Sequence, residues 1–115
     1  MTSLTDAVAL AESDNGLAGV STLRADHTIQ ASLINAGVLP HPASGELVLG
    51  YVTYGRVKLA NLRARPQTAV TFRKGWQWAT VEGRAELAGP DDAQPWLESE
   101  QMLAQLLRDI FTAAG

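Results

Sequence analysis

The chain is patterned as a series of short β-prone segments, and this pattern limits the folds open to it. Apolar and β-branched residues gather in short runs, and Gly, Pro, Asn and Asp stand between the runs. Such runs favour antiparallel strands joined by turns over the longer units of a βαβ protein. We therefore expect five strands, at residues 17–24, 29–34, 46–52, 67–73 and 76–87.

Helical signals occur in three places. An opening helix is expected, capped by Thr2, Ser3 or Thr5 and ended by Asn15-Gly16. A second helix covers residues 56–65, and Pro66 ends it. After Pro95 the apolar residues repeat at helical spacing and predict a third, amphipathic helix. Its inward set is Met102, Leu103, Leu106, Leu107, Ile110 and Phe111.

Gly and Pro also predict where the strands are interrupted. The Gly and Pro residues at positions 37–45 predict a long loop after the second strand. Gly83 predicts a bulge or sharp bend in the fifth strand. The whole pattern is β-rich with short α-helices. It predicts a single domain over residues 1–115, a small antiparallel barrel with helices packed outside it.

Size and composition set further limits. At 115 residues, 46% of them hydrophobic, the chain is long enough for one core, yet near the size at which a partner subunit helps to cover apolar surface. It has no Cys, and no apolar run approaches the ~20 residues that span a bilayer. The N-terminal segment lacks the basic and apolar regions of a signal peptide, so we expect a cytoplasmic location and no membrane partner.

Positive charge is concentrated in one stretch. The chain carries nine Lys and Arg against twelve Asp and Glu, but residues 47–81 contain six of the basic residues and no acidic one. Such an island on an acidic protein suits a compact anion, whereas nucleic acid usually requires a basic protein face. Within the island, a loop leads into the predicted helix at 56–65, where free N–H groups favour phosphate.

The chain shows no sign of unaided catalytic chemistry. Its two His residues, His27 and His41, stand in a turn and between prolines; we interpret each as solvated and expect no metal site. No Ser sits in a strained G-x-S-x-G turn, and the acidic residues near the C-terminus suit a solvated helix face. We expect no catalytic side chain, so an enzyme of this sequence would leave the hard chemistry to a cofactor.

Two groups of residues allow a structural or a functional interpretation. Strand alternation places Trp76, Trp78 and Thr80 on one face, where they pack in a core or interface, or stack on a cofactor. Gln30 and Ser32 alternate on the second strand, where they hydrogen-bond a polar heterocycle or belong to an exposed face. The residues alone leave both interpretations open.

Three blocks of sequence resemble one known family. They are G-V-S-T-L with I-Q-A-S at residues 19–32, G-R-V-K-L-A-N-L-R-A-R-P at 55–66, and G-W-Q-W-A-T-V-E-G-R-A-E-L at 75–87. In this order and spacing they resemble the pyridoxamine 5′-phosphate oxidase-like (PNPOx-like) superfamily, in particular its actinobacterial B-type branch of flavin/deazaflavin oxidoreductases, which use coenzyme F420. The resemblance runs from about Leu4 to the end of the chain.

The resemblance implies a split β-barrel of the FMN-binding type, forming a homodimer with cofactor sites across the interface. Arg56 and Lys58 would bind the cofactor phosphate, and Asn61 would support their loop. Family members continue with a further helix and a terminal strand, so a further C-terminal segment is expected. The ring and its side chain would be lined by Gln30, Ser32, Tyr51, Val52, Thr53 and Trp76.

The function that the resemblance implies is an F420H2-dependent reductase, which transfers a hydride between the deazaflavin and a small organic substrate. Two alternatives stay open: an FMN-dependent oxidase or reductase on the same fold, and a non-catalytic F420- or flavin-binding protein. No nucleic-acid partner is expected. The remaining basic residues of the island either meet the acidic tail of F420 or form a solvated surface; they are Arg63, Arg65, Arg73 and Lys74.

Overall fold

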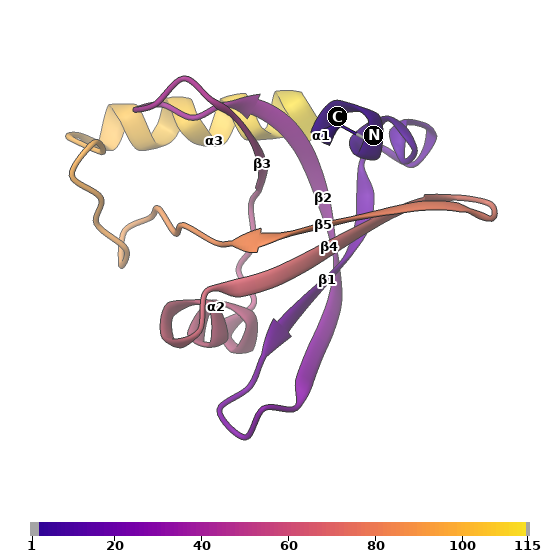
Figure 1. The fold of residues 1–115 in the computed structure, drawn as a ribbon. Coiled ribbons are helices and arrows are strands. Elements are labelled where there is room, and N and C mark those ends of the chain that lie inside the picture. Colours follow the sequence, from indigo (N-terminus) through magenta and orange to yellow (C-terminus); the bar gives the residue numbers. More distant parts are fainter. Residues whose placement is uncertain (1–2, 115) are drawn as a thin grey trace.

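The structure, a computed structural model, describes residues 3–114. One antiparallel sheet of five strands curls into a half-barrel (Figure 1), which confirms the β-rich fold class. The strand order is β3-β2-β1-β4-β5, with β1 at Leu17–Leu23, β2 at Ile29–Pro40, β3 at Leu47–Tyr51, β4 at Gln67–Lys74 and β5 at Gln77–Arg84. The helices are α1 at Leu4–Ala9, α2 at Arg56–Ala64 and α3 at Glu100–Ala114, with a 3-10 turn, η1, at Glu12–Asp14.

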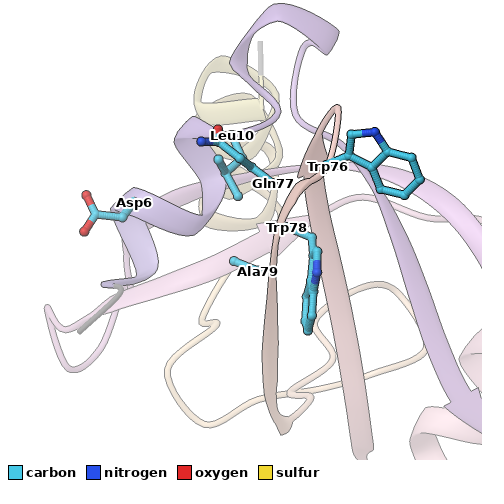
Figure 2. Close-up of a pocket in the computed structure, with 6 residues that line it drawn as sticks. All are labelled: Asp6, Leu10, Trp76, Gln77, Trp78 and Ala79. Carbon is cyan, nitrogen blue, oxygen red and sulfur yellow. The ribbon is translucent and has the colours of Figure 1, made fainter.

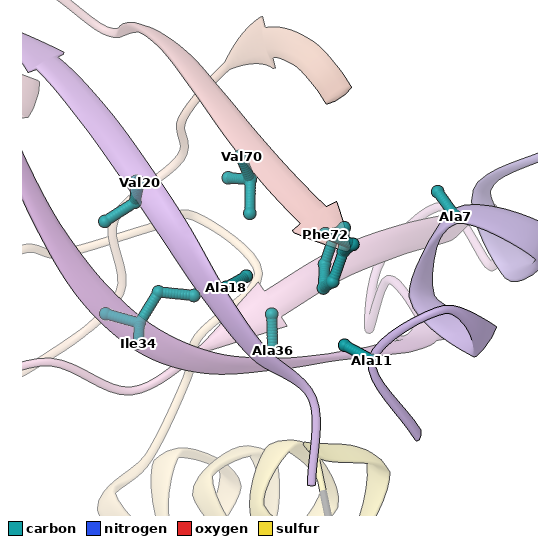
Figure 3. Close-up of a cluster of buried hydrophobic side chains, with 8 residues drawn as sticks. All are labelled: Ala7, Ala11, Ala18, Val20, Ile34, Ala36, Val70 and Phe72. Carbon is teal, nitrogen blue, oxygen red and sulfur yellow. The ribbon is translucent and has the colours of Figure 1, made fainter. Parts of the chain in front are cut away.

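Alternation along the strands separates a buried inner face from an outer one. On β1 the buried residues are Ala18, Val20 and Thr22, and the residues between them are more exposed. The core gathers on this inner face and under α1 (Figure 3), and its members are mostly small: Ala7, Ala11, Ala18, Val20, Ile34, Ala36, Val70 and Phe72. The small side chains leave room for α1 to pack close to the sheet.

Strand β2 is longer than expected and turns a corner of the half-barrel. It pairs with β1 as far as Asn35, and with β3 from Ala36 onward. The loop expected at residues 37–45 therefore begins later, because residues 37–40 are strand. Gly37 is required here by α3, since a Cβ atom would stand 2.3 Å from the carbonyl carbon of Ala113. This glycine marks a close helix contact instead of a loop.

The helices and β5 also differ in detail from expectation. Ser3 caps α1 in a capping box with Asp6, but the helix ends at Ala9, well before Gly16. In α3, Met102 and Phe111 are exposed, because the helix buries a narrower face than its apolar spacing indicates. No bulge occurs at Gly83, which pairs with Thr68 in an unbroken β4–β5 register. Among residues 3–114, no helix has the length and apolar character to cross a membrane.

Candidate functional site

Helix α2 turns polar residues toward the sheet. It packs on the inner side of β1, and its buried residues are Lys58, Asn61 and Leu62. The apolar Val57 of the same helix is exposed. An amphipathic helix normally buries its apolar stripe, so a buried Lys and a buried Asn require a specific explanation.

Lys58 is buried without an acidic partner. It is only 5% exposed, and its Nζ donates a hydrogen bond to Thr53 Oγ1 at 3.2 Å. Neither of the two salt bridges found in residues 3–114 involves this side chain. Burial lowers the pKa of the Lys58 ammonium, because the charged form loses its water. A buried cation with no counter-charge is costly, and an anionic ligand would offset that cost.

The start of α2 offers further anion-binding groups. Gly55 is the N-cap and no side chain caps the helix, so the first-turn N–H groups are open to a ligand. Thr53 Oγ1 also accepts from the Gly55 N–H at 3.3 Å, which links this loop to the Lys58 side chain. Arg56 is the first helical residue and is exposed. The start of α2 thus carries two basic residues beside a free helix N-terminus, with Arg56 exposed and Lys58 buried.

A chain of hydrogen bonds joins α2 to β1 and β2. Asn61 Nδ2 donates to Thr22 Oγ1 at 3.1 Å, and the Thr22 hydroxyl donates to Gln30 Oε1 at 2.9 Å. Thr22 is 2% exposed and Asn61 6% exposed, whereas Gln30 is half-buried. Asn61 therefore fastens α2 to the sheet. Sequence reasoning missed Thr22, and the one available signal was a polar residue at an inward position of β1.

Ser32 lies on the same face of β2 as Gln30. In the β1–β2 register Ser32 stands opposite Val20, and Gln30 stands opposite Thr22. The Ser32 Oγ is buried and is the one such side-chain atom in residues 3–114 with no hydrogen-bond partner. Buried polar atoms are nearly always paired, so the Ser32 hydroxyl has a hydrogen-bonding capacity that a water or a ligand would satisfy.

A cavity of about 1030 Å³ lies beside α2. This volume suits a small-molecule site, and α3 supplies part of an apolar wall through residues such as Leu106 and Ile110. Burial raises the pKa of Tyr51, so its phenol stays protonated and able to donate a hydrogen bond. Four of the predicted site residues line the cavity: Tyr51, Val52, Thr53 and Arg56. The other predicted site residues do not line it.

The segment between β5 and α3 lines one side of this cavity and is held at two points. Arg63 and Asp92 form a paired contact, Nε to Oδ1 at 2.8 Å and a terminal nitrogen to Oδ2 at 2.7 Å. This hydrogen bonding raises the pKa of Arg63 and lowers the pKa of Asp92. At the second point, Glu86 accepts from Trp96 Nε1 at 2.7 Å and contacts His41 Nε2 at 3.2 Å.

His41 is not the solvated histidine that its sequence setting indicated. Its Nδ1 accepts from the N–H groups of Ala43 and Ser44, at 3.0 and 3.3 Å, so Nε2 carries the proton toward Glu86. The ring also packs edge-on against Trp96, with centroids 5.0 Å apart. Both partners are distant in sequence, and no local signal identifies them. His27, by contrast, lies exposed in the β1–β2 turn as predicted.

The basic island does not form one continuous site. Arg63 is paired with Asp92, and Arg65 Nε donates to the Leu23 carbonyl at 2.9 Å. The other two tail-binding candidates, Arg73 and Lys74, end β4 at the tip of the β4–β5 hairpin, far from α2 (Figure 1). Of the cations of the island, those that are neither paired in the described chain nor remote from α2 are therefore Arg56 and Lys58.

Trp76 lies in the turn of the β4–β5 hairpin and is 100% exposed. Figure 2 shows its ring standing clear of α1, beside a shallow depression lined by Asp6 and Leu10. Trp76 is thus not brought to the residues around α2 within one chain. Trp78 is 70% exposed and shares the outer face of β5 with Thr80, as strand alternation predicts.

Other comparisons add no assignment. Within residues 3–114, no group of three or more His, Cys, Asp or Glu side chains is placed to hold a metal ion. Comparison of the chain with protein-family models, with curated proteins and with solved structures found no match. The groups gathered around α2 are therefore the main structural evidence on function.

Proposed function

We propose that this chain binds a phosphate-bearing redox cofactor at the start of α2 and acts as an F420H2-dependent reductase in the cytoplasm. The observation that carries the proposal is Lys58, a buried cation with one hydroxyl partner beside an uncapped helix N-terminus. The resemblance of residues 55–66 and 75–87 to deazaflavin oxidoreductases supports the choice of cofactor.

The residues at the start of α2 suit a phosphate group. Lys58 supplies a buried ammonium, Arg56 a guanidinium, and the first turn of α2 its backbone N–H groups. Charge-assisted hydrogen bonds from such groups contribute about 1.5–3 kcal/mol each. The phosphate would also supply the counter-charge that Lys58 lacks, which makes binding more favourable than at a solvated lysine.

The rest of the chain would position the reactants. The bound cofactor would supply the hydride chemistry, and the apolar cavity beside α2 would hold a small organic substrate and exclude water. Tyr51, whose pKa is raised by burial, would offer a hydrogen-bond donor in that cavity. No other residue need act as acid or base for this role.

FMN is the second candidate, and one observation favours it. F420 carries an acidic tail, yet Arg63 and Arg65 already have partners within the chain. The groups at the start of α2 suffice for one phosphate, which is all that FMN requires. A visible absorption titration with each cofactor separates the two. We expect F420 to bind more tightly than FMN, with a preference that shrinks as salt screens the tail.

We also propose a homodimer formed through the outer face of the sheet. Ile29, Leu33 and Trp78 are 66%, 68% and 70% exposed on this face. The outer residues of β1 and of the first half of β2 carry no charge, and Leu33 lies opposite Gly19. The solvent-facing side of an antiparallel sheet normally carries polar residues. Because this face is uncharged and exposes large apolar side chains, it suits contact with a second copy of the chain. Trp76 would then be able to line the cofactor site of the partner subunit.

The decisive test is binding at the start of α2. Lys58→Met keeps the length of the side chain and removes its charge, and Arg56→Ala removes the second cation. Each should weaken cofactor binding by about ten- to a hundredfold, because each 1.4 kcal/mol is a factor of ten. Arg108→Ala, at an exposed position of α3, is the matched control and should bind normally. Unchanged affinity in both test variants would remove the phosphate site.

A further inference from the structure

The hydrogen-bond chain from α2 to β2 has a direction. A threonine hydroxyl has one proton to donate. The Thr22 hydroxyl accepts from Asn61 Nδ2 at 3.1 Å, and because the amide oxygen Gln30 Oε1 at 2.9 Å can only accept, the hydroxyl gives its proton to Gln30. The carbonyl oxygen of Gln30 is therefore used inside the protein. Its amide NH2 group makes no hydrogen bond to another group in residues 3–114 and remains available for a ligand.

The surroundings of Gln30 also point to a ligand. Gln30 is half-buried, so its amide is partly accessible while its oxygen is held by the fully buried Thr22. Ser32, two residues along the same strand face, has a buried Oγ with no partner. A polar molecule would satisfy both the unused amide donor and the unpaired hydroxyl, which lie on neighbouring inward positions of β2.

Resting on the proposed function, we propose that Thr22 is a positioning residue that sets which hydrogen-bonding group Gln30 presents to the cofactor. With its oxygen held by Thr22, Gln30 offers N–H donors. The site then selects a heterocycle with an acceptor at this point, such as a ring carbonyl, over one with a donor there. This assigns the Thr22–Asn61 contact a role in ligand choice besides its role in fastening α2.

The physical basis is preorganisation. An unheld glutamine amide can turn its oxygen or its NH2 group outward with similar ease. Asn61 and Thr22, which are 6% and 2% exposed, remove that choice before the ligand binds. A ligand acceptor then meets a donor that needs no reordering, which strengthens binding.

The direction of the chain can be tested without a cofactor, from the side-chain amide signals in an NMR spectrum. Thr22→Val keeps the shape and removes the hydroxyl, and Thr22→Ser keeps the hydroxyl. We expect the Asn61 amide protons to exchange slowly in wild type and Thr22→Ser, and faster in Thr22→Val. The Gln30 amide protons should exchange rapidly in the unliganded wild type. Slow exchange at Gln30 that Thr22→Val abolishes would show the opposite direction and overturn the proposal.

The role in binding is tested by a double-mutant cycle with FMN and F420. Thr22→Val should weaken binding by about three- to tenfold, the effect of one neutral hydrogen bond, and Thr22→Ser should restore it. In a Gln30→Ala background, Thr22→Val should weaken binding less than it does in the wild type, because the part of its effect that acts through Gln30 is already lost. Losses that simply add would overturn the positioning role.

Two further outcomes separate this inference from the proposed function. Gln30→Glu keeps an oxygen for Thr22 but has no N–H donor, so it should lose at least as much affinity as Gln30→Ala; full affinity would overturn the inference even if Thr22→Val does not fold. Wild-type protein that binds neither cofactor would overturn the proposed function, and this inference with it. Tight wild-type binding with additive losses would overturn this inference alone.

Discussion

Lys58 Nζ lies 3.2 Å from Thr53 Oγ1 and has no acidic partner within residues 3–114. The hydroxyl satisfies one of three ammonium donors and neutralises none of the charge. The buried charge at the start of α2 therefore lowers the stability of the folded chain. Functional sites often reduce stability in this way because their residues are arranged for binding.

This relationship predicts that Lys58→Met will stabilise the unliganded protein while it weakens phosphate binding. Removing the desolvated charge should raise the free energy of unfolding. The folded pKa of Lys58 lies below its usual 10.5, so between the two values the unfolded chain binds more protons. The wild type should thus regain stability as pH rises toward 10.5, and the advantage of Lys58→Met should shrink. Denaturant unfolding at several pH values measures this; a destabilised Lys58→Met would contradict it.

The contact of Arg63 with Asp92 predicts a stability difference between the wild type and Asp92→Asn that depends on pH. The pKa of Asp92 is held below its usual 3.8 by the hydrogen bond from Arg63, so this stabilisation is present above 3.8 and is lost as pH falls through the folded pKa. Asp92→Asn should lower the melting temperature near neutral pH, and the difference from wild type should vanish in strong acid. Asp91→Asn is the matched control, because Asp91 makes no salt bridge in the described chain. A difference that persists in strong acid would indicate a contribution other than charge.

The contact of Gly37 with α3 predicts a severe effect of a single methyl group. A Cβ at Gly37 would meet the Ala113 carbonyl carbon at 2.3 Å, so α3 must shift away. Gly37→Ala should destabilise the fold by about 1–3 kcal/mol, the usual cost of overpacking. Gly83→Ala, where nothing lies within 4 Å of the added atom, should be nearly neutral. Equal stability of the two variants in a denaturant titration would count against the position of α3.

The proposed dimer predicts that a charge on the outer sheet face will yield monomers. Leu33→Glu would place a carboxylate in the centre of an uncharged face that the proposed partner covers, and desolvating it is unfavourable. Phe111→Glu makes the same change at an exposed position of α3 and should leave the dimer intact. Sedimentation at micromolar concentration distinguishes them. A monomeric wild type would remove the dimer but leave the start of α2 to be tested by binding.

Much of the secondary structure follows from short-range chemistry in the chain. The sequence predicts a helix at residues 56–65, and α2 covers Arg56–Ala64, because Gly55 opens the helix and Pro66 prevents its continuation. The strands appear where β-branched and apolar residues alternate between turn residues, and β3 and β4 match within a residue at each end. The expected inward positions of α3 are right for Leu103, Leu106, Leu107 and Ile110, which line the cavity.

The sequence alone thus determined the β-rich class, the position of α2 and the charge placed at its start, since these depend on propensity, turn residues and composition. The tertiary structure decided which side chains meet. The burial of Lys58, the Asn61–Thr22–Gln30 chain and the Arg63–Asp92 contact join residues far apart in sequence. Alternation shows which face of a strand points inward, but it cannot show which distant element covers that face, because the curl of the sheet and the packing of the helices determine those contacts together.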